Sequence, residues 1–243
     1  MADLHLIGGE KGGPGKSMVC RTLTQYHLDR DYTFTLYDTD RSNPDLMRIY
    51  GKSAGCQLGV FSEGEQYEDT ANAIFNSAIA ARTLCNLPAQ VFIPLKDWIE
   101  KNDLLSLAHE SGICFYLWHV SDCGSDSLKL FRRSLKHFGT AMPHIFVKNY
   151  GMTDNWEPFD SDERLQALIA AHDVTIMSFP KFIGNKDRNI IDNLSLTFGD
   201  ARAYEGFGPI SRQRVKTFLR KAYAAFDGVP ALCQSPSSSH KGR

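Results

Sequence analysis

The sequence contains no run of about 18 apolar residues, so it predicts no membrane-spanning helix. Its first residues lead directly into the apolar run 4–7, without the charged leader and apolar core of a secretory signal. Neither sign of charge dominates, since the chain has 27 Lys and Arg residues and 28 Asp and Glu residues. That balance gives no global attraction to nucleic acid or to an anionic membrane. We therefore expect a cytoplasmic protein with no membrane partner.

The six cysteines form no CxxC pair and have no metal-ligand spacing with a histidine. Thiols scattered in this way along 243 residues are typical of a reduced intracellular protein and not of a disulfide framework. They are Cys20, Cys56, Cys85, Cys114, Cys123 and Cys233.

Short apolar runs alternate with helical patterns, and no internal repeat or long linker interrupts them. The apolar runs predict strands at 4–7, 34–37, 82–85, 113–120, 144–148 and 174–178. The helical patterns predict helices at 17–30, 69–81, 95–109, 126–138, 162–171 and 211–226. This alternation favours one α/β domain over residues 1–232, with a mostly parallel β-sheet covered by helices on both faces. The polar residues 233–243 are expected to form a disordered tail.

A glycine-rich loop follows the first predicted strand, with the sequence Lys11-Gly12-Gly13-Pro14-Gly15-Lys16-Ser17. Glycines let backbone amides curl around phosphate oxygens, and the helix that starts behind them adds the positive end of its dipole. Lys16 can reach the terminal phosphates of a nucleotide, and the Ser17 hydroxyl can ligate Mg²⁺. The loop therefore predicts a phosphate site, with Met18 at its end.

This loop departs from the ordinary Walker pattern, because Glu10 stands where that pattern has its first glycine. It matches the deviant form of the P-loop, in which a second lysine, Lys11, precedes the glycines. The segment resembles the signature of the ParA/MinD family of ATPases. That resemblance implies that ATP closes a homodimer, that Lys11 crosses the interface to the partner's nucleotide, and that Lys16 acts within its own chain. A second cation at the phosphates stabilises charge that develops during transfer.

Acidic residues close the second predicted strand at Asp38-Thr39-Asp40. The resemblance makes Asp40 the catalytic residue that orients or activates water, and it places Asp38 near Mg²⁺. Two positions compete for the family's Walker B aspartate, Asp122 and Asn86, and the order of elements favours Asn86. An amide can hold a Mg²⁺-bound water but brings no charge. We therefore expect binding of ATP and ADP with slow hydrolysis.

Two further positions are candidates for contact with the base of the nucleotide. Asn149 ends a predicted strand where the family reads the purine edge, although a strand-end turn explains an asparagine there equally well. Phe179-Pro180 ends the next strand, where the resemblance places Pro180 and its backbone against adenine.

Several short segments resemble a narrower group, the MobD/TraL/StbB-like proteins of mobile plasmids. The resemblance implies a role in plasmid transfer or stability, with an adaptor or cargo protein as partner and association with the nucleoid or a plasmid. The matching segments are Asn86-Leu87-Pro88-Ala89-Gln90, Trp98, Leu117-Trp118-His119-Val120, Asp126-Ser127-Leu128 and Arg212-Gln213-Arg214-Val215.

Basic residues on the last predicted helix are candidates for non-specific contact with DNA phosphates. A solvated face of an amphipathic surface helix explains them equally well. They are Arg212, Arg214, Lys216, Arg220 and Lys221.

Three other functions are compatible with the same pattern. An ATP-binding regulator would hold the nucleotide with little hydrolysis, which Asn86 permits. A metabolic ATP-dependent ligase needs a polar substrate pocket, for which the sequence shows no motif. A reductase resembling the nitrogenase iron protein needs two cysteines that share a cluster, and Cys85 and Cys123 are candidates by location alone.

Overall fold

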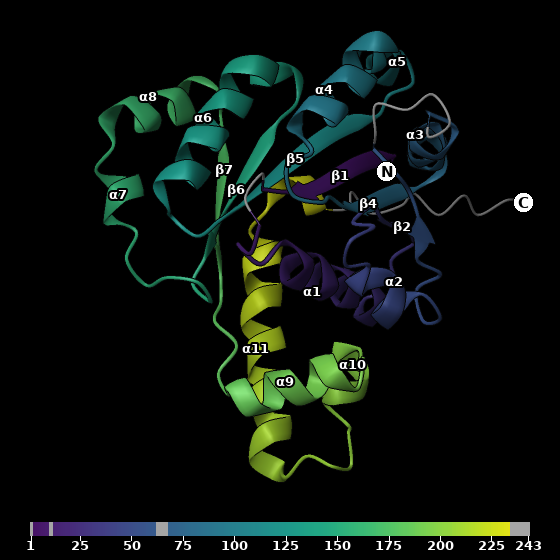
Figure 1. Cartoon of the computed structure of the whole chain (residues 1–243), viewed down its shortest axis with the longest axis vertical. Coiled ribbons are helices and arrows are strands. Elements are labelled where there is room, and N and C mark those ends of the chain that lie inside the picture. The colour runs from purple at the N-terminus through teal and green to yellow at the C-terminus, as the bar shows by residue number, and fades with distance from the viewer. Residues whose placement is uncertain (1, 10–11, 62–67, 234–243) are drawn as a thin grey trace, which may run out of the picture.

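A computed structural model of the chain describes residues 2–9, 12–61 and 68–233, and its strands form one parallel sheet (Figure 1). The strands lie in the order β3-β2-β4-β1-β5-β6-β7. They are β1 (Asp3–Gly8), β2 (Phe34–Asp38), β3 (Gln57–Leu58), β4 (Arg82–Asn86), β5 (Cys114–Ser121), β6 (His144–Asn149) and β7 (Thr175–Phe179). Because all pairings are parallel, the carboxyl ends of the strands share one edge of the sheet.

Helices cover both faces of this sheet, as the strand alternation requires. One face carries α3 (Glu68–Ala80), α4 (Phe92–Lys101), α5 (Leu104–Glu110), α6 (Ser125–Phe138), α7 (Glu157–Asp160) and α8 (Glu163–Ala171). The other carries α1 (Lys16–Asp29), α2 (Asp45–Tyr50), α9 (Asn185–Asn193), α10 (Phe198–Ala201) and α11 (Pro209–Asp227). Two short 3₁₀ turns, η2 (Gly139–Ala141) and η3 (Pro230–Leu232), complete the elements.

Neighbouring residues of a strand enter different hydrophobic cores. In β1, Leu6 packs in the core beneath α3, α4 and α5, whereas Ile7 packs beneath α1 and α11. In β5, Leu117 and Trp118 divide in the same way. The side-chain period of two along a strand produces this division. Both faces of the sheet are therefore packed against helices, and the loops at its carboxyl edge start from this packed frame.

A buried ion pair closes the amino edge of the sheet. Arg82 donates to Asp3 at 2.7 Å, and its remaining donors reach the carbonyls of Ala231 and Leu232 at 3.1 and 3.3 Å. Burial opposes ionisation of Asp3, but hydrogen bonds and charge from His5 and Arg82 lower its pKa to about 2. Because every charge is paired, the network tolerates burial and ties the end of the described chain to β1 and β4.

The predicted α/β class with a parallel sheet is confirmed, and the predicted strands agree within about two residues. The single helix expected over 95–109 is wrong. Asp103 has φ of +47°, a left-handed conformation that ends α4 and starts α5. The sequence pattern hid the break, because apolar residues on both helices, including Trp98 and Leu104, face the same core.

Besides the two 3₁₀ turns, five short elements have no counterpart in the sequence prediction, namely α2, β3, α7, α9 and α10. Except for α9, each has six residues or fewer, too few to establish a period. The predicted tail lies outside the described residues except for Cys233. Among the described residues, no helix has both the length and the apolar character needed to cross a membrane.

Candidate functional site

The phosphate loop connects β1 to α1 at the carboxyl edge of the sheet. Gly13 and Gly15 have φ of +90° and +92°, in the left-handed region that favours glycine. A Cβ on Gly15 would collide with the side-chain amide of Asn149. The loop therefore requires glycine at this position for two separate reasons. Lys11 and Glu10 lie outside the described residues, so the role of Lys11 stays a prediction.

The N-terminus of α1 is arranged to receive an anion. Its N-cap, Gly15, offers no side-chain cap, so the first backbone amides of the helix lack that partner. Lys16 opens the helix and is only 7% exposed. A Cβ placed on Gly12 or Gly13 would meet nothing within 4 Å, so open space faces the loop. These features fit a bound phosphate.

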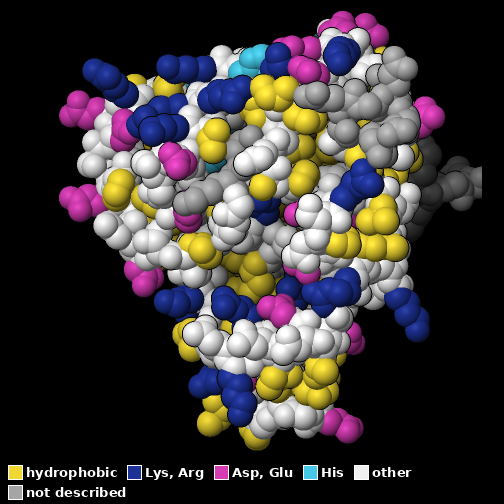
Figure 2. All heavy atoms as spheres, viewed as in Figure 1, with side chains coloured by type: hydrophobic (Ala, Val, Ile, Leu, Met, Phe, Trp, Pro, Cys, Tyr) yellow, Lys and Arg dark blue, Asp and Glu magenta, His cyan; other side chains and the backbone are white. Residues whose placement is uncertain are grey.

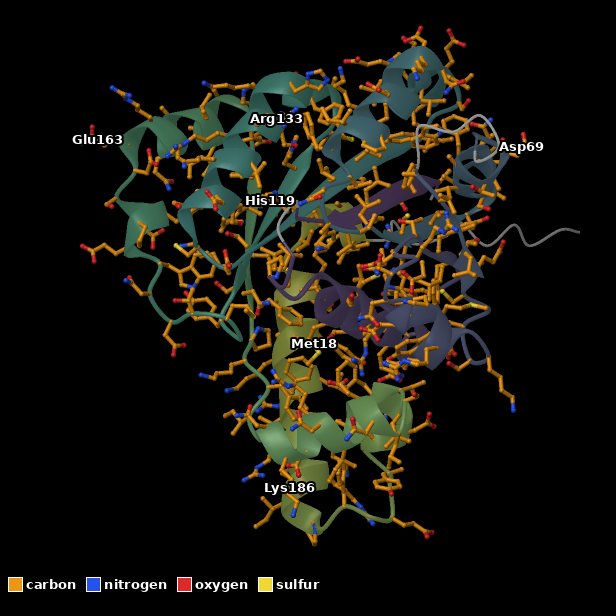
Figure 3. The ribbon with its side chains drawn as sticks, viewed as in Figure 1. Met18, Asp69, His119, Arg133, Glu163 and Lys186 are labelled. Carbon is orange, nitrogen blue, oxygen red and sulfur yellow. The ribbon has the colours of Figure 1, made fainter. Side chains whose placement is uncertain are left out.

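A cavity of about 320 Å³ opens beside the loop, which is within the volume range of small-ligand sites. It brings together six of the residues predicted from the sequence to bind nucleotide. These are Gly13, Gly15, Ser17, Met18 (labelled in Figure 3), Asn149 and Pro180. The predicted phosphate end and the predicted base end therefore share one cavity. Gly12, Pro14 and Lys16 belong to the same loop but do not line the cavity wall.

Asn149, at the end of β6, braces the phosphate loop. Its side-chain nitrogen donates to the carbonyl of Pro14 at 2.7 Å, and its oxygen accepts from the Gly151 amide at 2.9 Å. The side chain is buried but lines the cavity. Asn149 therefore has a structural role that the sequence did not predict, and its contact with a purine stays a prediction.

Asp38 and Asn86 are neighbours at the carboxyl edge, because β2 and β4 pair in the register that aligns them. The Asn86 amide donates to one Asp38 oxygen at 3.0 Å. The other oxygen accepts from the amides of Leu46 and Met47, at the start of α2. Burial raises the pKa of Asp38, and these hydrogen bonds oppose the rise. Asp38 thus anchors α2, and its oxygens are already occupied.

The side-chain oxygen of Asn86 is the notable atom of this pair. It is buried and has no hydrogen-bond partner among the described residues. A buried acceptor left without a partner costs about 1–3 kcal/mol. A water bound to Mg²⁺ would satisfy it, which is the role the sequence predicted for Asn86.

Asp40 and Asp122 occupy different surroundings. Asp40 is half-buried, and one of its oxygens accepts from the amides of Ser42 and Asn43 at 3.1 and 3.2 Å. Asp122 follows β5, on the opposite side of β1 from β4, and accepts from the Gly124 amide at 3.0 Å. The alignment of Asn86 with Asp38 supports Asn86 as the Walker B counterpart.

The residues at this edge fit Mg²⁺ only as part of a nucleotide complex. The described residues contain no group of three or more His, Cys, Asp or Glu side chains able to hold a metal. Mg²⁺ keeps several waters and commonly binds through phosphates and one or two protein ligands. Ser17 would be the direct ligand here, with Asn86 acting through water and Asp38 nearby.

Comparison with known proteins agrees with this geometry. No family model matches the chain. TraL of Escherichia coli is 24% identical over 247 residues, which cover 96% of this chain and 100% of TraL. MobD of Acidithiobacillus ferrooxidans is 35% identical over 69 residues, only 28% of this chain and 30% of MobD. The MinD cell division protein of Aquifex aeolicus superposes with a TM-score of 0.52 at 14% identity, over 90% of this chain and 96% of MinD.

The chain has the ParA/MinD fold. The resemblance drawn from the phosphate loop is therefore confirmed at the level of the fold. The similarity to TraL and MobD supports the plasmid-related branch of the ParA/MinD resemblance.

One wall of the cavity beside the phosphate loop comes from α9, which sequence reasoning missed. This helix contributes Asn185, Arg188, Asn189 and Asp192 to the cavity. Arg21 of α1 meets it there and donates to Asp192 at 2.6 Å. A possible sequence signal was the pair Ile190 and Ile191 within a polar run after Gly184, since such a pair can form the buried side of a short helix.

The basic residues of α11 do not form one strip. Lys216 and Arg220 border a depression with Arg30 and Tyr223, whereas Arg214 and Lys221 line a different groove. The remaining residue, Arg212, donates to the carbonyls of Tyr204 and Glu205. Residues four or seven apart lie on the same face of a helix, so Lys216 and Arg220 share one face of α11 and Arg214 and Lys221 share another.

A second concentration of positive charge lies between α4 and α6, where Figure 2 shows Lys and Arg side chains gathered at the upper left. Its basic members are Lys96, Lys129, Arg132, Arg133, Lys136 and His137. Several are paired with carboxylates, such as Arg132 with Asp162. Within the part of the chain that the structure describes, Arg133 and Lys136 have no carboxylate partner. Sequence reasoning missed this patch because two helices contribute to it.

Cys85 and Cys123 are not placed to share a cluster. Cys85 is fully buried in the core beneath α3, α4 and α5. Cys123 belongs to the separate core beneath α6, α7 and α8. The geometry therefore gives no support to the reductase alternative.

Proposed function

We propose that this chain is an ATP-binding switch of the ParA/MinD type. It dimerises when it binds ATP, hydrolyses the nucleotide slowly, and positions, partitions or helps to transfer a cargo, which we take to be plasmid DNA. One observation carries the proposal: the cavity that joins the phosphate loop to Asn149 and Pro180. A site with a phosphate cradle at one end and a base wall at the other fits a nucleotide.

Each residue of the site has a chemical part in this proposal. The backbone amides of Gly12, Gly13 and Gly15 and those at the start of α1 hold the phosphates, and Lys16 neutralises their charge. Ser17 binds Mg²⁺, Asn86 holds one of its waters, and Asp40 orients the attacking water. Lys11 reaches the nucleotide of the other protomer. Because Asn86 supplies no negative charge, Mg²⁺ is held less firmly and turnover is slow.

The proposed adaptor rests on similar proteins, whereas the proposed dimer rests on the resemblance carried by Lys11. MinD of Aquifex aeolicus has also been solved as a MinC:MinD complex, so a protein with this fold binds a partner protein. The likeness to TraL and MobD supports a cargo connected with plasmid transfer. By this analogy, the closed dimer of this chain would present a surface to an adaptor or cargo protein.

Light scattering with ADP, ATP and a non-hydrolysable analogue tests the switch. We expect the molecular mass to double with ATP and with the analogue but not with ADP. Lys11→Ala should bind ATP and stay monomeric, and Lys16→Ala should lose ATP binding at least about 100-fold, because it removes the cation that the phosphates need. Lys101→Ala, an exposed lysine at the end of α4, is the matched control. A Lys11→Ala protein that still dimerises with ATP contradicts the proposal.

DNA binding is a separate part of the proposal, with two candidate surfaces. One surface has Arg133 and Lys136 on α6, and the other has Lys216 and Arg220 on α11. In the described chain, none of these four side chains has a carboxylate partner. Each phosphate contact contributes about −0.9 to the slope of log affinity against log salt. Reversing Arg133 and Lys136 to Glu should therefore reduce the slope by about two and weaken DNA binding roughly tenfold or more at low salt.

Filter binding or fluorescence anisotropy with a random-sequence duplex gives this measurement. The double reversal of Lys216 and Arg220 to Glu is tested beside it, to locate the surface. If neither double variant changes DNA retention or its salt dependence, the protein does not contact DNA through these residues.

An ATP-binding regulator that does not hydrolyse ATP is the second candidate. Asn86 favours it, because a chain without the Walker B charge can bind nucleotide and still lack turnover. A dimer that forms with ATP and persists for many hours without phosphate release would favour the regulator over the hydrolysing switch.

A further inference from the structure

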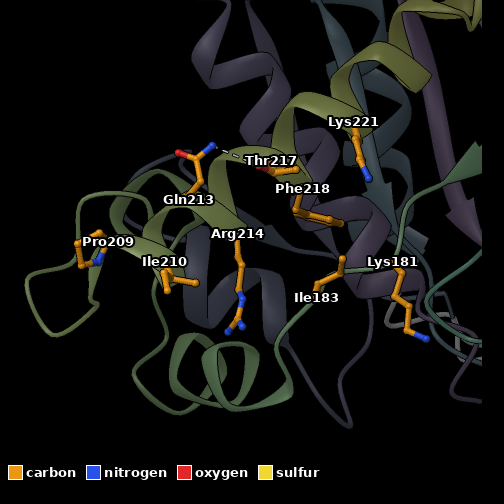
Figure 4. Close-up of a pocket in the computed structure, with 9 residues that line it drawn as sticks. All are labelled: Lys181, Ile183, Pro209, Ile210, Gln213, Arg214, Thr217, Phe218 and Lys221. Carbon is orange, nitrogen blue, oxygen red and sulfur yellow. Dashed lines mark hydrogen bonds between the residues drawn. The ribbon is translucent and has the colours of Figure 1, made fainter.

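A groove separate from the nucleotide cavity runs beside α11 (Figure 4). Its volume is about 490 Å³. One wall is the segment that follows β7, with Lys181 and Ile183, and the other wall is α11 itself. From Ile210 to Lys221 the helix extends for about 17 Å, which matches about three turns of a second helix.

The floor of the groove is apolar and accessible. Ile183 and Ile210 are 62% and 70% exposed, the highest values among the large hydrophobic side chains of the described residues. In the close-up, Phe218 lies next to Ile183, and Arg214 lies between Ile183 and Ile210. Phe218 is otherwise buried. Large apolar side chains exposed at one groove mark a place where a partner binds.

The sides of the groove are basic. Lys181, Arg214 and Lys221 line it, and no acidic side chain does so among the described residues. Arg214 donates to Asp187 at 2.9 Å, and Lys181 lies 3.9 Å from Asp154. The positive charges of Arg214 and Lys181 are therefore partly neutralised by these carboxylates. Lys221 has no carboxylate partner in the described chain. The groove therefore combines an apolar floor with an excess of positive charge.

We propose that this groove is the docking site for an acidic amphipathic helix of a partner protein. The apolar face of such a helix would cover Ile183, Ile210 and the edge of Phe218, and its acidic flank would meet Lys181 and Lys221. The inference deepens the proposed function, because it specifies the chemistry of the adaptor.

Other occupants match the groove less well. Two copies of the same groove facing each other would bring the basic side chains Lys181 and Lys221 together, which opposes a symmetric contact. A nucleic acid would satisfy the charge but would leave Ile183 and Ile210 in water. The acidic amphipathic helix satisfies both the charge and the apolar floor.

The groove shares structure with the nucleotide cavity. Lys181 lines both of them. Asp187 of α9 accepts from Ser211 and Arg214 of α11, each at 2.9 Å, while the same α9 forms a wall of the nucleotide cavity. A helix bound in the groove would contact α11 next to its hydrogen bonds with α9. Because α9 also lines the nucleotide cavity, docking and nucleotide binding would be coupled.

Fluorescence anisotropy with designed peptides tests the proposal on the nucleotide-free full chain. Three labelled peptides of about 14 residues are compared: one with leucines at helical spacing and glutamates beside them, one with lysines in place of the glutamates, and one with serines in place of the leucines. We expect the acidic amphipathic peptide to bind most tightly. Ile183→Ser, Ile210→Ser and Lys221→Glu should each weaken it at least about fivefold. Lys216→Glu, on the other side of α11, and Ile79→Ser, an exposed isoleucine of α3, should not change the affinity.

Because these residues are exposed, the variants should fold, and circular dichroism confirms it. Equal affinity for all three peptides, no binding of the acidic peptide up to about 1 mM, or equal binding by the groove variants would each overturn the proposal. The assay needs no nucleotide. Its failure therefore leaves the ATP-dependent dimer intact, and failure of the dimer assay leaves the groove intact.

Discussion

Replacing Asn86 by aspartate is expected to destabilise the nucleotide-free protein by about 3 kcal/mol and to increase turnover of MgATP at least about tenfold. In the wild-type chain the Asn86 amide donates to Asp38 at 3.0 Å. Asn86→Asp removes this donor and places a second carboxylate beside a buried first one, so the two would compete for one proton. Mg²⁺ at this site would relieve the repulsion, and the added carboxylate would hold the metal more firmly than the amide does.

Two measurements check this expectation. Urea unfolding with and without MgATP should show the loss of stability and its recovery, and phosphate release should show the faster turnover. Asn86→Ala serves as control, because it removes the hydrogen bond without adding charge and should not increase turnover. Unchanged phosphate release in Asn86→Asp, or a wild-type turnover already within the roughly 1–100 s⁻¹ of kinases, contradicts the role given to Asn86.

Lowering the pH from about 7.5 to about 5 is expected to reduce the free energy of unfolding by about 6 kcal/mol. Four histidines of the described chain are buried, and three of them, His27, His119 and His144, lie outside the ion-paired network of Asp3 and Arg82. Burial is the largest cause that lowers their pKa values, to about 3, 3 and 4. Each must stay neutral in the folded chain, whereas in the unfolded chain it binds a proton near pH 6.5.

The sign of the effect follows from proton binding. Below about pH 6.5 the unfolded state binds more protons than the folded state, so stability is fully present above that pH and falls as the pH decreases towards the folded values. Each histidine contributes about 1.4 kcal/mol per pH unit, hence about 2 kcal/mol at pH 5. Asp38, whose pKa burial raises, acts in the opposite direction but is a single group.

Thermal melts in a pH series measure this loss, which corresponds to a decrease in Tm of roughly 12–24 °C. His144, whose ring accepts or donates a hydrogen bond with Ser134 at 2.8 Å, offers a selective variant. His144→Gln should reduce the slope of stability against pH between about 6.5 and 5 by about 1.4 kcal/mol per unit. The exposed His109→Gln should leave it unchanged. A wild-type stability that is flat over this range would contradict neutral burial of these histidines.

The sheet and the phosphate loop could be predicted because their signals are local. A continuous apolar run such as 113–120 has few alternatives to a buried strand, and glycines at positions 13 and 15 suit the left-handed backbone found there. Asn86 could be singled out by its order along the chain, and the register with Asp38 supports that choice. The unpaired side-chain oxygen of Asn86 could not be predicted, since it depends on how β4, β2 and the start of α2 pack together.

The walls of the site could not be predicted because distant segments build them. α9 is polar and short, and it is held in place by Arg21 and by Asp187 bonding to α11. The basic residues of α11 looked like one strip in the sequence, but the helix places Lys216 and Lys221 in different hollows. A helical pattern indicates which residues face the core and leaves open how the remaining surface is shared among neighbours.

Two cysteines lie at the amino edge of the sheet, near the ion pair of Asp3 and Arg82, and they are useful for experiments. Cys114 aligns with Asp3 in the sheet, and Cys233 follows Leu232, whose carbonyl Arg82 holds. These two thiols are exposed, and the other four are buried. A maleimide dye would therefore attach at the amino edge of the sheet, opposite the phosphate loop. The natural chain thus carries its own attachment points for donor and acceptor dyes, and energy transfer between two labelled copies can follow their association without any engineered cysteine.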